Sequence, residues 1–408
     1  MKLYAGLDIG NGYVKGKCQN EETKATYNID IASCAAYVTS DSALKARPEE
    51  IQGIIDNIYD QMDLTFDTNL VKDTTNRLFG ERAIHSDRTL EQFDVLSNAS
   101  KCHQDIYGVL ILASIAGTAL KDYFATNNKL PDEDELIKVN ARIAIALPIR
   151  EYKSYRDICA AEYKEGTHIV TFHNFDKRIR IQIKFDNVQV AAEGASAQFA
   201  LMLHPELIEG MLNECKTNDP EFDQTITAQD VINAQNIIGI DIGEGTANMP
   251  VFTDGKFNSD ASQTLNKGYG NVLTTALDRL TEEGYPFNDR KALASYLQST
   301  PSRLSQNRYN KISQIVDEEK VAYVKELKLK FSRVLSSSGA FTEVIYVYGG
   351  GANPLKEQLY SVLRESLKES NLDIPVLYLD SSYSRNLNRE GLFFIVNSVA
   401  QSEKKKSA

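Results

Sequence analysis

The residues Leu7-Asp8-Ile9-Gly10-Asn11-Gly12 near the start of the chain return past its middle as Ile240-Asp241-Ile242-Gly243-Glu244-Gly245. Apolar, β-prone residues precede and follow each copy, so each copy predicts a strand, a glycine turn and a second strand. A repeat separated by so much sequence indicates a large internal duplication and not a short tandem array. We therefore expect two similar hairpins, each with an aspartate beside its tip.

The composition of both tips suits a phosphate and metal site. Glycines lack a Cβ and tolerate positive φ, so backbone N–H groups at a glycine-rich tip can converge on an anion. Asn11 in the first copy and Thr246 in the second add a polar side chain. Asp8 and Asp241 would repel phosphate, so their expected role is to hold a divalent cation, usually through water. Two facing hairpins would clamp the phosphates of a nucleotide and its metal between two halves of the molecule.

Length and composition narrow the class of protein. At 408 residues the chain is expected to form two domains or lobes, with 42% apolar and 25% charged residues as in soluble globular proteins. The net charge of −11 argues against a general binder of nucleic acid or of anionic membranes. Five scattered cysteines without a CxxC pair fit reduced thiols in a cytoplasm.

No membrane or export signal is expected. Met1-Lys2 runs directly into a predicted strand, which leaves no room for a signal peptide. The most apolar stretch, Val109 to Leu120, is too short to span a bilayer and predicts a buried helix. We therefore expect a cytoplasmic protein.

Strands and helices alternate in both halves, which predicts an α/β fold class. Beyond the two hairpins, strands are predicted at 25–32, 77–84, 139–147, 168–173, 178–190, 256–260, 343–348 and 374–379. Helices are predicted at 48–62, 105–126, 151–164, 193–203, 271–283, 310–334, 354–369 and 389–400. The polar segment 204–236 contains two prolines and a short predicted helix, and it is predicted to connect the halves.

A third candidate site element is Gly349-Gly350-Gly351, between the apolar strand Val344–Tyr348 and a helix that starts at Pro354. A glycine run there lets the backbone approach a base or sugar near a helix N-terminus. The alternative is a tight turn between strand and helix. A turn rarely needs three glycines, which favours ligand contact.

Two charged residues are weaker candidates. Glu193 stands between a strand and a segment rich in small residues, where a carboxylate could polarise water for attack on a γ-phosphate. On spacing alone, a first-turn glutamate stabilised by the helix dipole is the simpler interpretation. Lys311 could touch a nucleotide or lie in solvent. The sequence contains no GxxxxGK[ST], which excludes a P-loop NTPase, and no GxGxxG that opens a Rossmann helix.

The order of these motifs resembles the actin/Hsp70/sugar-kinase ATPase superfamily. The similar segments are Leu7–Lys15 (first phosphate motif), Val190–Ala197 (first connecting helix), Ile240–Thr246 (second phosphate motif), Ile345–Ala352 (adenosine motif) and Glu390–Ile395 (second connector). Within the superfamily the chain is most similar to the bacterial actin-like plasmid-segregation proteins, the ParM/Alp group. That similarity lies in Asn310-Lys311-Ile312-Ser313, the Gly-Gly-Gly-Ala turn and the segment Gly268–Leu273.

The resemblance implies two RNase H-like domains around a nucleotide cleft. Residues 1–203 would form the first domain, 204–236 the connector and 237–385 the second domain, with a C-terminal helix at 386–408 packing back on the first. ATP or GTP would bind with Mg²⁺. Asp8 and Asp241 would organise Mg²⁺ and water, Lys15 would reach the β- and γ-phosphates, and Glu193 would position the attacking water.

The remaining residues implied for nucleotide binding are Gly10, Asn11, Gly12, Gly243, Glu244, Gly245, Thr246, Gly268, Lys311, Gly349, Gly350, Gly351 and Ala352. The tip residues would hold the phosphates, and Gly350 and Gly351 would approach the adenosine. Two features depart from the family pattern. The connector is longer than expected, and Glu244 places an extra negative charge beside the phosphates.

The resemblance further implies filaments that polymerise with nucleotide and move plasmids. The expected partners are other copies of the chain and a DNA-bound adaptor protein, with no direct contact to nucleic acid or membrane. A small-molecule kinase of the same superfamily is the main alternative, although the sequence has no clear sugar-binding segment. A chaperone-like regulatory ATPase is disfavoured because no peptide-binding domain follows the ATPase pair.

Overall fold

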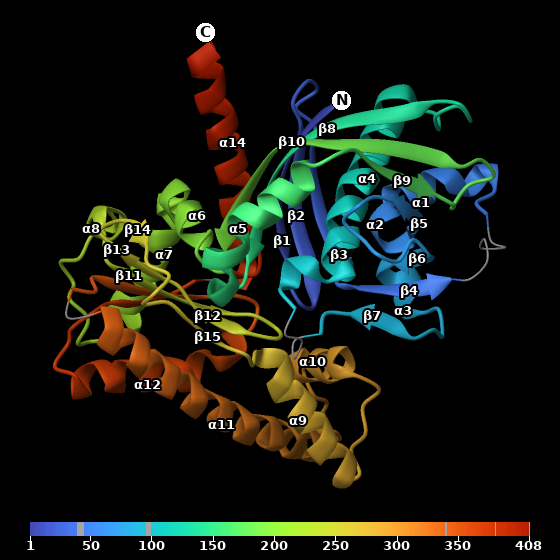
Figure 1. Ribbon diagram of the computed structural model, residues 1–408. Helices are drawn as coiled ribbons and strands as arrows, with labels where there is room; N and C mark the ends of the chain where they lie inside the picture. Colours follow the sequence, from blue (N-terminus) through green and yellow to red (C-terminus); the bar gives the residue numbers. More distant parts are fainter. Residues whose placement is uncertain (39–44, 95–98, 339–340, 380, 408) are drawn as a thin grey trace. The chain divides into compact units, whose positions relative to one another are not determined.

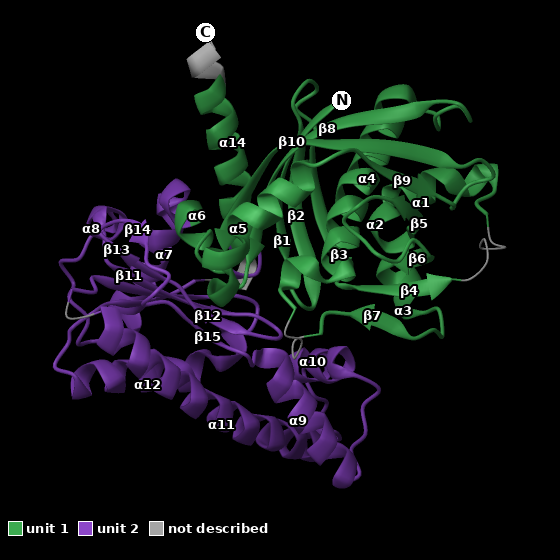
Figure 2. Ribbon diagram, viewed as in Figure 1, with its two compact units in different colours: residues 1–200, 388–408 green, residues 201–387 purple. Residues whose placement is uncertain are grey.

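The computed structural model describes residues 1–38, 45–94, 99–338, 341–379 and 381–407 (Figure 1). The chain divides into two compact units, residues 1–200 with 388–408 and residues 201–387 (Figure 2). Each unit contains one β-sheet with helices packed on it, so the predicted α/β class is confirmed.

The first unit is built on a ten-stranded sheet. Its strands are β1 (Lys2–Ile9), β2 (Tyr13–Asn20), β3 (Thr26–Ala32), β4 (Cys34–Val38), β5 (Asp63–Asp67), β6 (Asn76–Phe79), β7 (Leu90–Gln92), β8 (Leu136–Leu147), β9 (His168–Phe172) and β10 (Ile179–Ala192). Its helices are η1 (Pro48–Glu50), α1 (Ile51–Asp56), α2 (Ile58–Gln61), α3 (Gly80–Ile84), η2 (Lys101–His103), α4 (Asp105–Asn127), α5 (Ile149–Lys164) and most of α6 (Ala197–Leu203) and α14 (Leu387–Ser407).

The strand order β3-β2-β1-β8-β10-β9-β5-β6-β4-β7 determines where polar residues gather. β1 is parallel to β8, and β8 is parallel to β10. The carboxyl ends of parallel strands meet at one edge of a sheet, where ligands bind in open α/β sheets. Asp8 near the end of β1 and Glu193 just after β10 therefore lie at the same edge.

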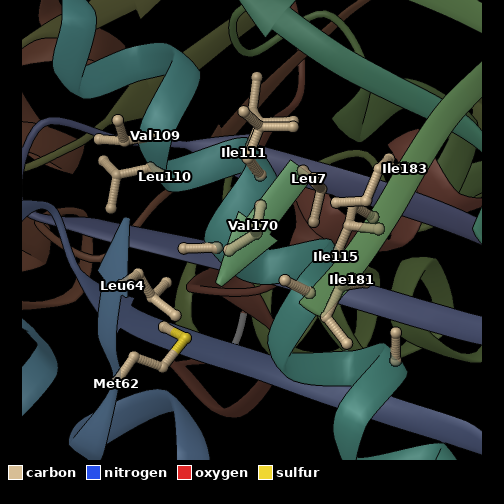
Figure 3. Packing of buried hydrophobic residues seen from close by; sticks show 14 of the residues in the cluster. Leu7, Met62, Leu64, Val109, Leu110, Ile111, Ile115, Val170, Ile181 and Ile183 are labelled. Carbon is tan, nitrogen blue, oxygen red and sulfur yellow. The ribbon is translucent and has the colours of Figure 1, made fainter. Parts of the chain in front are cut away.

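The two faces of the first sheet are covered by different helices. Side chains alternate along a strand, so Leu3, Ala5 and Leu7 of β1 point to one face, where they share an apolar cluster with α4. Figure 3 shows Leu7 in this cluster with Ile115 of α4 and Ile181 of β10. Tyr4 points to the other face and packs with α14.

α4 is the buried helix that the sequence predicts, but it is longer than the apolar stretch. Its 23 residues make it long and apolar enough to cross a membrane, and 78% of the apolar window is buried inside the protein. Its apolar residues pack with β1, β8 and β10, so they serve as core.

Two glycines allow α14 to pack closely on the rest of the first unit. A Cβ at Gly6 of β1 would overlap the backbone nitrogen of Phe393, and a Cβ at Gly391 of α14 would overlap the carbonyl oxygen of Ser196. The backbone of α14 can therefore approach β1 and the turn at residues 193–196 this closely because glycine has no side chain at these two positions.

Gly391→Ala is expected to lower the free energy of unfolding by about 1–3 kcal/mol, since backbone must move to admit the methyl group. Thermal denaturation followed by circular dichroism measures the change. Gly53→Ala in α1 is the matched control, because a Cβ there meets nothing within 4 Å. Equal melting temperatures for the two variants would contradict the close packing at Gly391.

His168 in β9 is buried among apolar residues, and burial lowers its pKa below the usual value. Its Nε2 lies 3.2 Å from the Tyr163 carbonyl oxygen, which can only accept, so Nε2 carries the proton. Nδ1 then accepts from the Thr68 hydroxyl at 2.7 Å. These two hydrogen bonds, one donated and one accepted, require the neutral form of the imidazole ring.

Because the folded pKa of His168 is depressed, the unfolded chain takes up the proton first as the pH falls. Its contribution to stability is complete above about pH 6.5 and is lost below it, at up to about 1.4 kcal/mol per pH unit. Chemical denaturation between pH 7.5 and 5 should show a shallower loss of stability for His168→Gln than for the wild type. Identical slopes would refute this prediction.

Several predicted element boundaries are wrong for local reasons. The predicted strand 77–84 ends at Phe79, because Gly80 has φ +62° and begins α3. The predicted helix 48–62 is interrupted at Asn57, which has φ −111° and ψ 31°. The helix expected from Glu193 starts only at Ala197, since Gly194 has φ +80° and residues 193–196 form a turn.

The second unit has a seven-stranded sheet. Its strands are β11 (Ile237–Ile242), β12 (Ala247–Met249), β13 (Val251–Thr253), β14 (Lys256–Phe257), β15 (Gln263–Leu265), β16 (Val344–Tyr348) and β17 (Val376–Tyr378). Its helices are α7 (Pro205–Asn218), α8 (Ala228–Asn233), α9 (Tyr269–Glu282), α10 (Arg290–Gln298), α11 (Gln306–Ser338), η3 (Asn353–Leu355), α12 (Lys356–Glu369) and α13 (Ser381–Ser384).

The central strands of the second sheet repeat those of the first. β11 is antiparallel to β12 and β13 and parallel to β16, which is parallel to β17. β12 and β13 are one strand interrupted at Pro250, which has no N–H to donate. Its carbonyl still accepts from Gly239 N at 2.8 Å and keeps the strands paired.

Residues 204–236, the predicted connector, lie within the second unit. They contain α7 and α8, and α7 packs on the sheet beside β17. The Cys215 thiol of α7 lies 3.4 Å from the Val376 carbonyl oxygen, to which it donates.

Candidate nucleotide-binding site

The two repeated motifs fold into the same hairpin turn. Gly10 N donates to Tyr13 O at 3.1 Å in the first, and Gly243 N donates to Thr246 O at 2.9 Å in the second. The strand register places Lys15 opposite Asp8, and the equivalent residue Asn248 opposite Asp241. This local geometry matches the predicted pair of hairpins.

Gly10 and Gly243 are needed for space and not for positive φ. Neither has a φ in the left-handed region. A Cβ at Gly10 would lie 2.8 Å from the Tyr13 carbonyl oxygen, and one at Gly243 would lie 3.1 Å from that of Thr246. The glycines allow the turn to close tightly on itself.

The first tip is anchored to the chain that follows β3. Ser33 donates from its hydroxyl to Gly10 O at 2.6 Å and from its backbone to Gly12 O at 2.9 Å. The carbonyl oxygens of Gly10 and Gly12 thus accept hydrogen bonds from Ser33. That arrangement fits a tip whose N–H groups serve an anion.

Asp8 is half-buried and lies near charged groups of both signs. Burial raises its pKa, and the ammonium group of Lys15 acts in the opposite direction. Smaller contributions come from Glu193, which raises the pKa, and from Lys101, which lowers it. The first unit therefore brings together three predicted site residues and one that the sequence did not predict.

The residue missed by sequence reasoning is Lys101. Its ammonium group lies 2.6 Å from Glu193 Oε1, and the two side chains are only 7% and 12% exposed. Glu193 is itself fixed at the sheet edge, where its backbone N donates to Leu147 O at 2.8 Å. No sequence motif marks Lys101, since its partner is 92 residues away.

In the second unit the start of α9 binds the second tip. Tyr269 N donates to Gly243 O at 2.9 Å, and Gly270 N donates to Glu244 O at 2.8 Å. Gly268 also lies against this turn, since a Cβ there would overlap the carbonyl group of Glu244. Gly268 is thus placed next to the tip, where it makes room for backbone.

Glu244 does not leave an uncompensated charge at the tip. Arg290 Nη2 at the start of α10 lies 3.0 Å from Glu244 Oε1, and both side chains are partly exposed. The ion pair offsets the negative charge that the sequence places beside the expected phosphates.

The three consecutive glycines have different surroundings. Gly349 has φ +97°, and a Cβ there would lie 2.5 Å from Asp241 Oδ1. A Cβ at Gly351 would lie 2.6 Å from the Cβ of Tyr269, whereas one at Gly350 would meet nothing within 4 Å. Gly349 and Gly351 are therefore required by packing, and Gly350 presents open backbone that a ligand could approach.

The second unit assembles most of its predicted residues around the end of β11. Asp241 is 7% exposed and is paired in register with Tyr348, just before the three glycines. Gly351 N donates to Ile242 O at 2.8 Å, which ties this turn to the strand that carries Asp241. Ala352 N donates to Gly349 O at 3.1 Å and closes the turn.

Lys311 lies far along α11 from this site. Tyr323 of the same helix donates to Lys267 O, next to the start of α9, at 2.9 Å. Lys311 instead pairs with Glu283, just after the end of α9, at 3.2 Å. A helix rises about 1.5 Å per residue, so Lys311 is roughly 18 Å along the helix from Tyr323.

The carboxylates of Asp8 and Asp241 suit a metal ion that binds together with a nucleotide. Among the described residues, no group of three or more histidine, cysteine, aspartate or glutamate side chains could hold a metal ion. Asp8 and Asp241 each offer a single carboxylate at a tip. Mg²⁺ retains several waters and is commonly held by one or two carboxylates together with phosphates, so this donor set suits Mg²⁺ bound with a nucleotide.

Family models match both halves of the chain. Residues 6–195 match the N-terminal domain of actin-like proteins, and residues 239–361 match the C-terminal region of archaeal MreB-like actin homologues. None of the curated proteins matches the sequence.

Solved structures with the same fold cover nearly the whole chain. Actin-like protein Alp7A is 15% identical, with a TM-score of 0.64 over 100% of both chains. The archaeal actin homologue Ta0583 is 11% identical, with a TM-score of 0.61 over 97% of this chain and 99% of its own. Bacillus thuringiensis ParM with AMPPNP is 17% identical, with a TM-score of 0.59 over 98% and 99%. At these identities the likeness shows the actin-like fold.

Proposed function

We propose that this chain, which belongs to the actin-like proteins, is a filament-forming nucleoside triphosphatase that drives the segregation of plasmid DNA. The observation that carries the proposal is the repeated hairpin, with the same closed turn and an adjacent aspartate in each unit. A single glycine hairpin is common, but two equivalent ones in an actin-like fold support the binding of nucleotide phosphates.

ATP is the proposed nucleotide, with GTP as the alternative. The similar Bacillus thuringiensis ParM has been solved with ATP, ADP and AMPPNP, which supports an adenine nucleotide here. Backbone N–H groups of residues 11–12 and 244–246 would bind the phosphates, since those of Gly10 and Gly243 close the turns. Lys15 would reach the β- and γ-phosphates, and Gly350 would approach the adenosine through its open backbone.

The proposed hydrolysis depends on three carboxylates. Asp8 and Asp241 would hold the water shell of Mg²⁺, which when bound would neutralise charge on the phosphates. Glu193 would accept a proton or hydrogen bond from the attacking water, as expected of a general base at a sheet edge. Hydrolysis would then weaken contacts between subunits that the triphosphate state favours.

We assign two kinds of partner. Other copies of the chain would form the filament, and a DNA-bound adaptor would connect filament ends to a plasmid. The net charge of −11 supports an adaptor, because a protein so acidic is a poor ligand for the DNA backbone. A cytoplasmic location follows from this role.

Right-angle light scattering with Mg²⁺ and ATP or GTP, with phosphate release followed in parallel, tests the proposal. Scattering should rise on addition of the preferred nucleotide and decay as phosphate appears. Turnover without scattering, and only in the presence of a sugar or small acid, would instead identify a small-molecule kinase.

A further inference from the structure

We propose that Lys101 is a positioning residue for Glu193, and that it holds the glutamate carboxylate in the orientation needed for hydrolysis. This inference rests on the proposed triphosphatase function and assigns a role to a residue outside the repeated motifs. It depends on an ion pair that lies within the first unit.

The ion pair is close and largely removed from solvent. Lys101 Nζ lies 2.6 Å from Glu193 Oε1, and the side chains are 7% and 12% exposed. An exposed ion pair of this kind would contribute little, since solvent screens it. A buried one restricts both side chains, because neither charge can leave its partner without a large loss of favourable interaction.

Lys101 is held from both ends. Glu151 of α5 accepts hydrogen bonds from Lys101 N and from the Ser100 hydroxyl, each at 2.8 Å. The ammonium group lies 5.0 Å from the centre of the Phe93 ring, within the range of a cation–π interaction. A lysine that is fixed at both its backbone and its ammonium group provides a rigid support for a carboxylate.

Glu193 needs such a support because its backbone lies in a turn. Residues 193–196 form no helix, and Gly194 has φ +80°. Its backbone N is fixed by Leu147 O, and its side chain extends from this turn to the ammonium group of Lys101. Misplacing a carboxylate by about 1 Å can lower the rate about a hundredfold, so the proposed hydrolysis requires that Lys101 orient Glu193.

The test measures single-turnover hydrolysis of Mg²⁺-ATP, and the dissociation constant of ATP, for Lys101→Met, Lys101→Arg, Glu193→Gln and the double variant K101M/E193Q. We expect K101M to lower the hydrolysis rate about ten- to a hundredfold, with the dissociation constant changed by less than about twofold. Lys101→Arg should restore part of the rate. In the E193Q background, K101M should cause no further fall, because its effect passes through Glu193.

Lys121→Met is the matched control. Lys121 lies on α4 and donates to Asp56 O at 2.6 Å, so the variant removes one lysine charge from the same unit without touching Glu193. Its hydrolysis rate should equal that of the wild type. Melting temperatures of all variants show whether each is folded. If K101M alone is unfolded, K101R takes its place: the fall in hydrolysis rate that K101R causes in the wild type is compared with the fall it causes in the E193Q background.

Four results would overturn the inference. An equal fall caused by K101M with and without Glu193 would show that Lys101 acts independently of it. A loss confined to ATP affinity would show that Lys101 binds the phosphates itself. A normal hydrolysis rate for K101M, together with a slow rate for E193Q, would show that Lys101 does not position Glu193 and would leave the triphosphatase proposal intact. Absence of hydrolysis in the wild type would reject both the role of Lys101 and the triphosphatase proposal.

Discussion

Replacing Asp241 with alanine is expected to lower hydrolysis of Mg²⁺-ATP by at least about a hundredfold, the usual loss when one preorganised electrostatic group is removed. Asp241 stands at the end of the central strand β11 and is 7% exposed. The backbone at Gly349 packs directly against its carboxylate. No other carboxylate of the second tip occupies that position, because Glu244 is paired with Arg290.

Phosphate release measured over a range of Mg²⁺ concentrations tests this prediction. The dependence of ATP binding on Mg²⁺ should be weaker in D241A than in the wild type, and EDTA should therefore reduce ATP binding less in D241A. Asp278→Ala removes the same charge from an exposed position on α9 and should leave hydrolysis unchanged. Full turnover by D241A, with the Mg²⁺ dependence of the wild type, would show that the metal is held elsewhere.

Glu193→Gln is expected to slow hydrolysis by about 10²–10⁴-fold, the range that a positioned general base contributes. Glutamine has nearly the same shape and can still accept a hydrogen bond from Lys101, so the variant removes the charge with little change of packing. Binding of ATP should remain within about twofold of the wild type, because the predicted role of Glu193 concerns water and not the nucleotide.

Light scattering extends the measurement on Glu193→Gln to filaments. Scattering after addition of ATP should rise as in the wild type but persist, because the triphosphate is no longer consumed. Glu133→Gln, an exposed glutamate in the loop before β8, is the control for the loss of one carboxylate. Unchanged phosphate release by E193Q would rule out Glu193 as the base and would favour a water held by the tips alone.

Short-range contacts explain why the two hairpins of the candidate site could be predicted from the sequence. Each hairpin consists of adjacent strands joined by a four-residue turn, so its partners lie within a few residues of one another. Glycines and alternating apolar residues then determine the turn and the strands around it. The same holds for α4, whose apolar run predicts the buried helix that the structure contains.

Element boundaries were predicted less well because they depend on backbone angles that composition does not reveal. Gly80 and Gly194 both adopt positive φ and end or delay an element that the apolar pattern continues. The sequence also did not reveal the whole reason for a glycine at position 349. Its neighbours suggested ligand contact, whereas its Cβ position is excluded by Asp241 from another strand.

The sequence by itself determined the two glycine hairpins, their aspartates and the α/β class, because these depend on short-range periodicity and turn chemistry. Only the tertiary structure decided which charges meet at the sites. The Lys101–Glu193 pair joins residues 92 positions apart, and Arg290 reaches Glu244 from the start of a different helix. Such pairs form because tertiary packing places helix starts beside strand ends from distant parts of the chain, and no local pattern in the chain records which segments those will be.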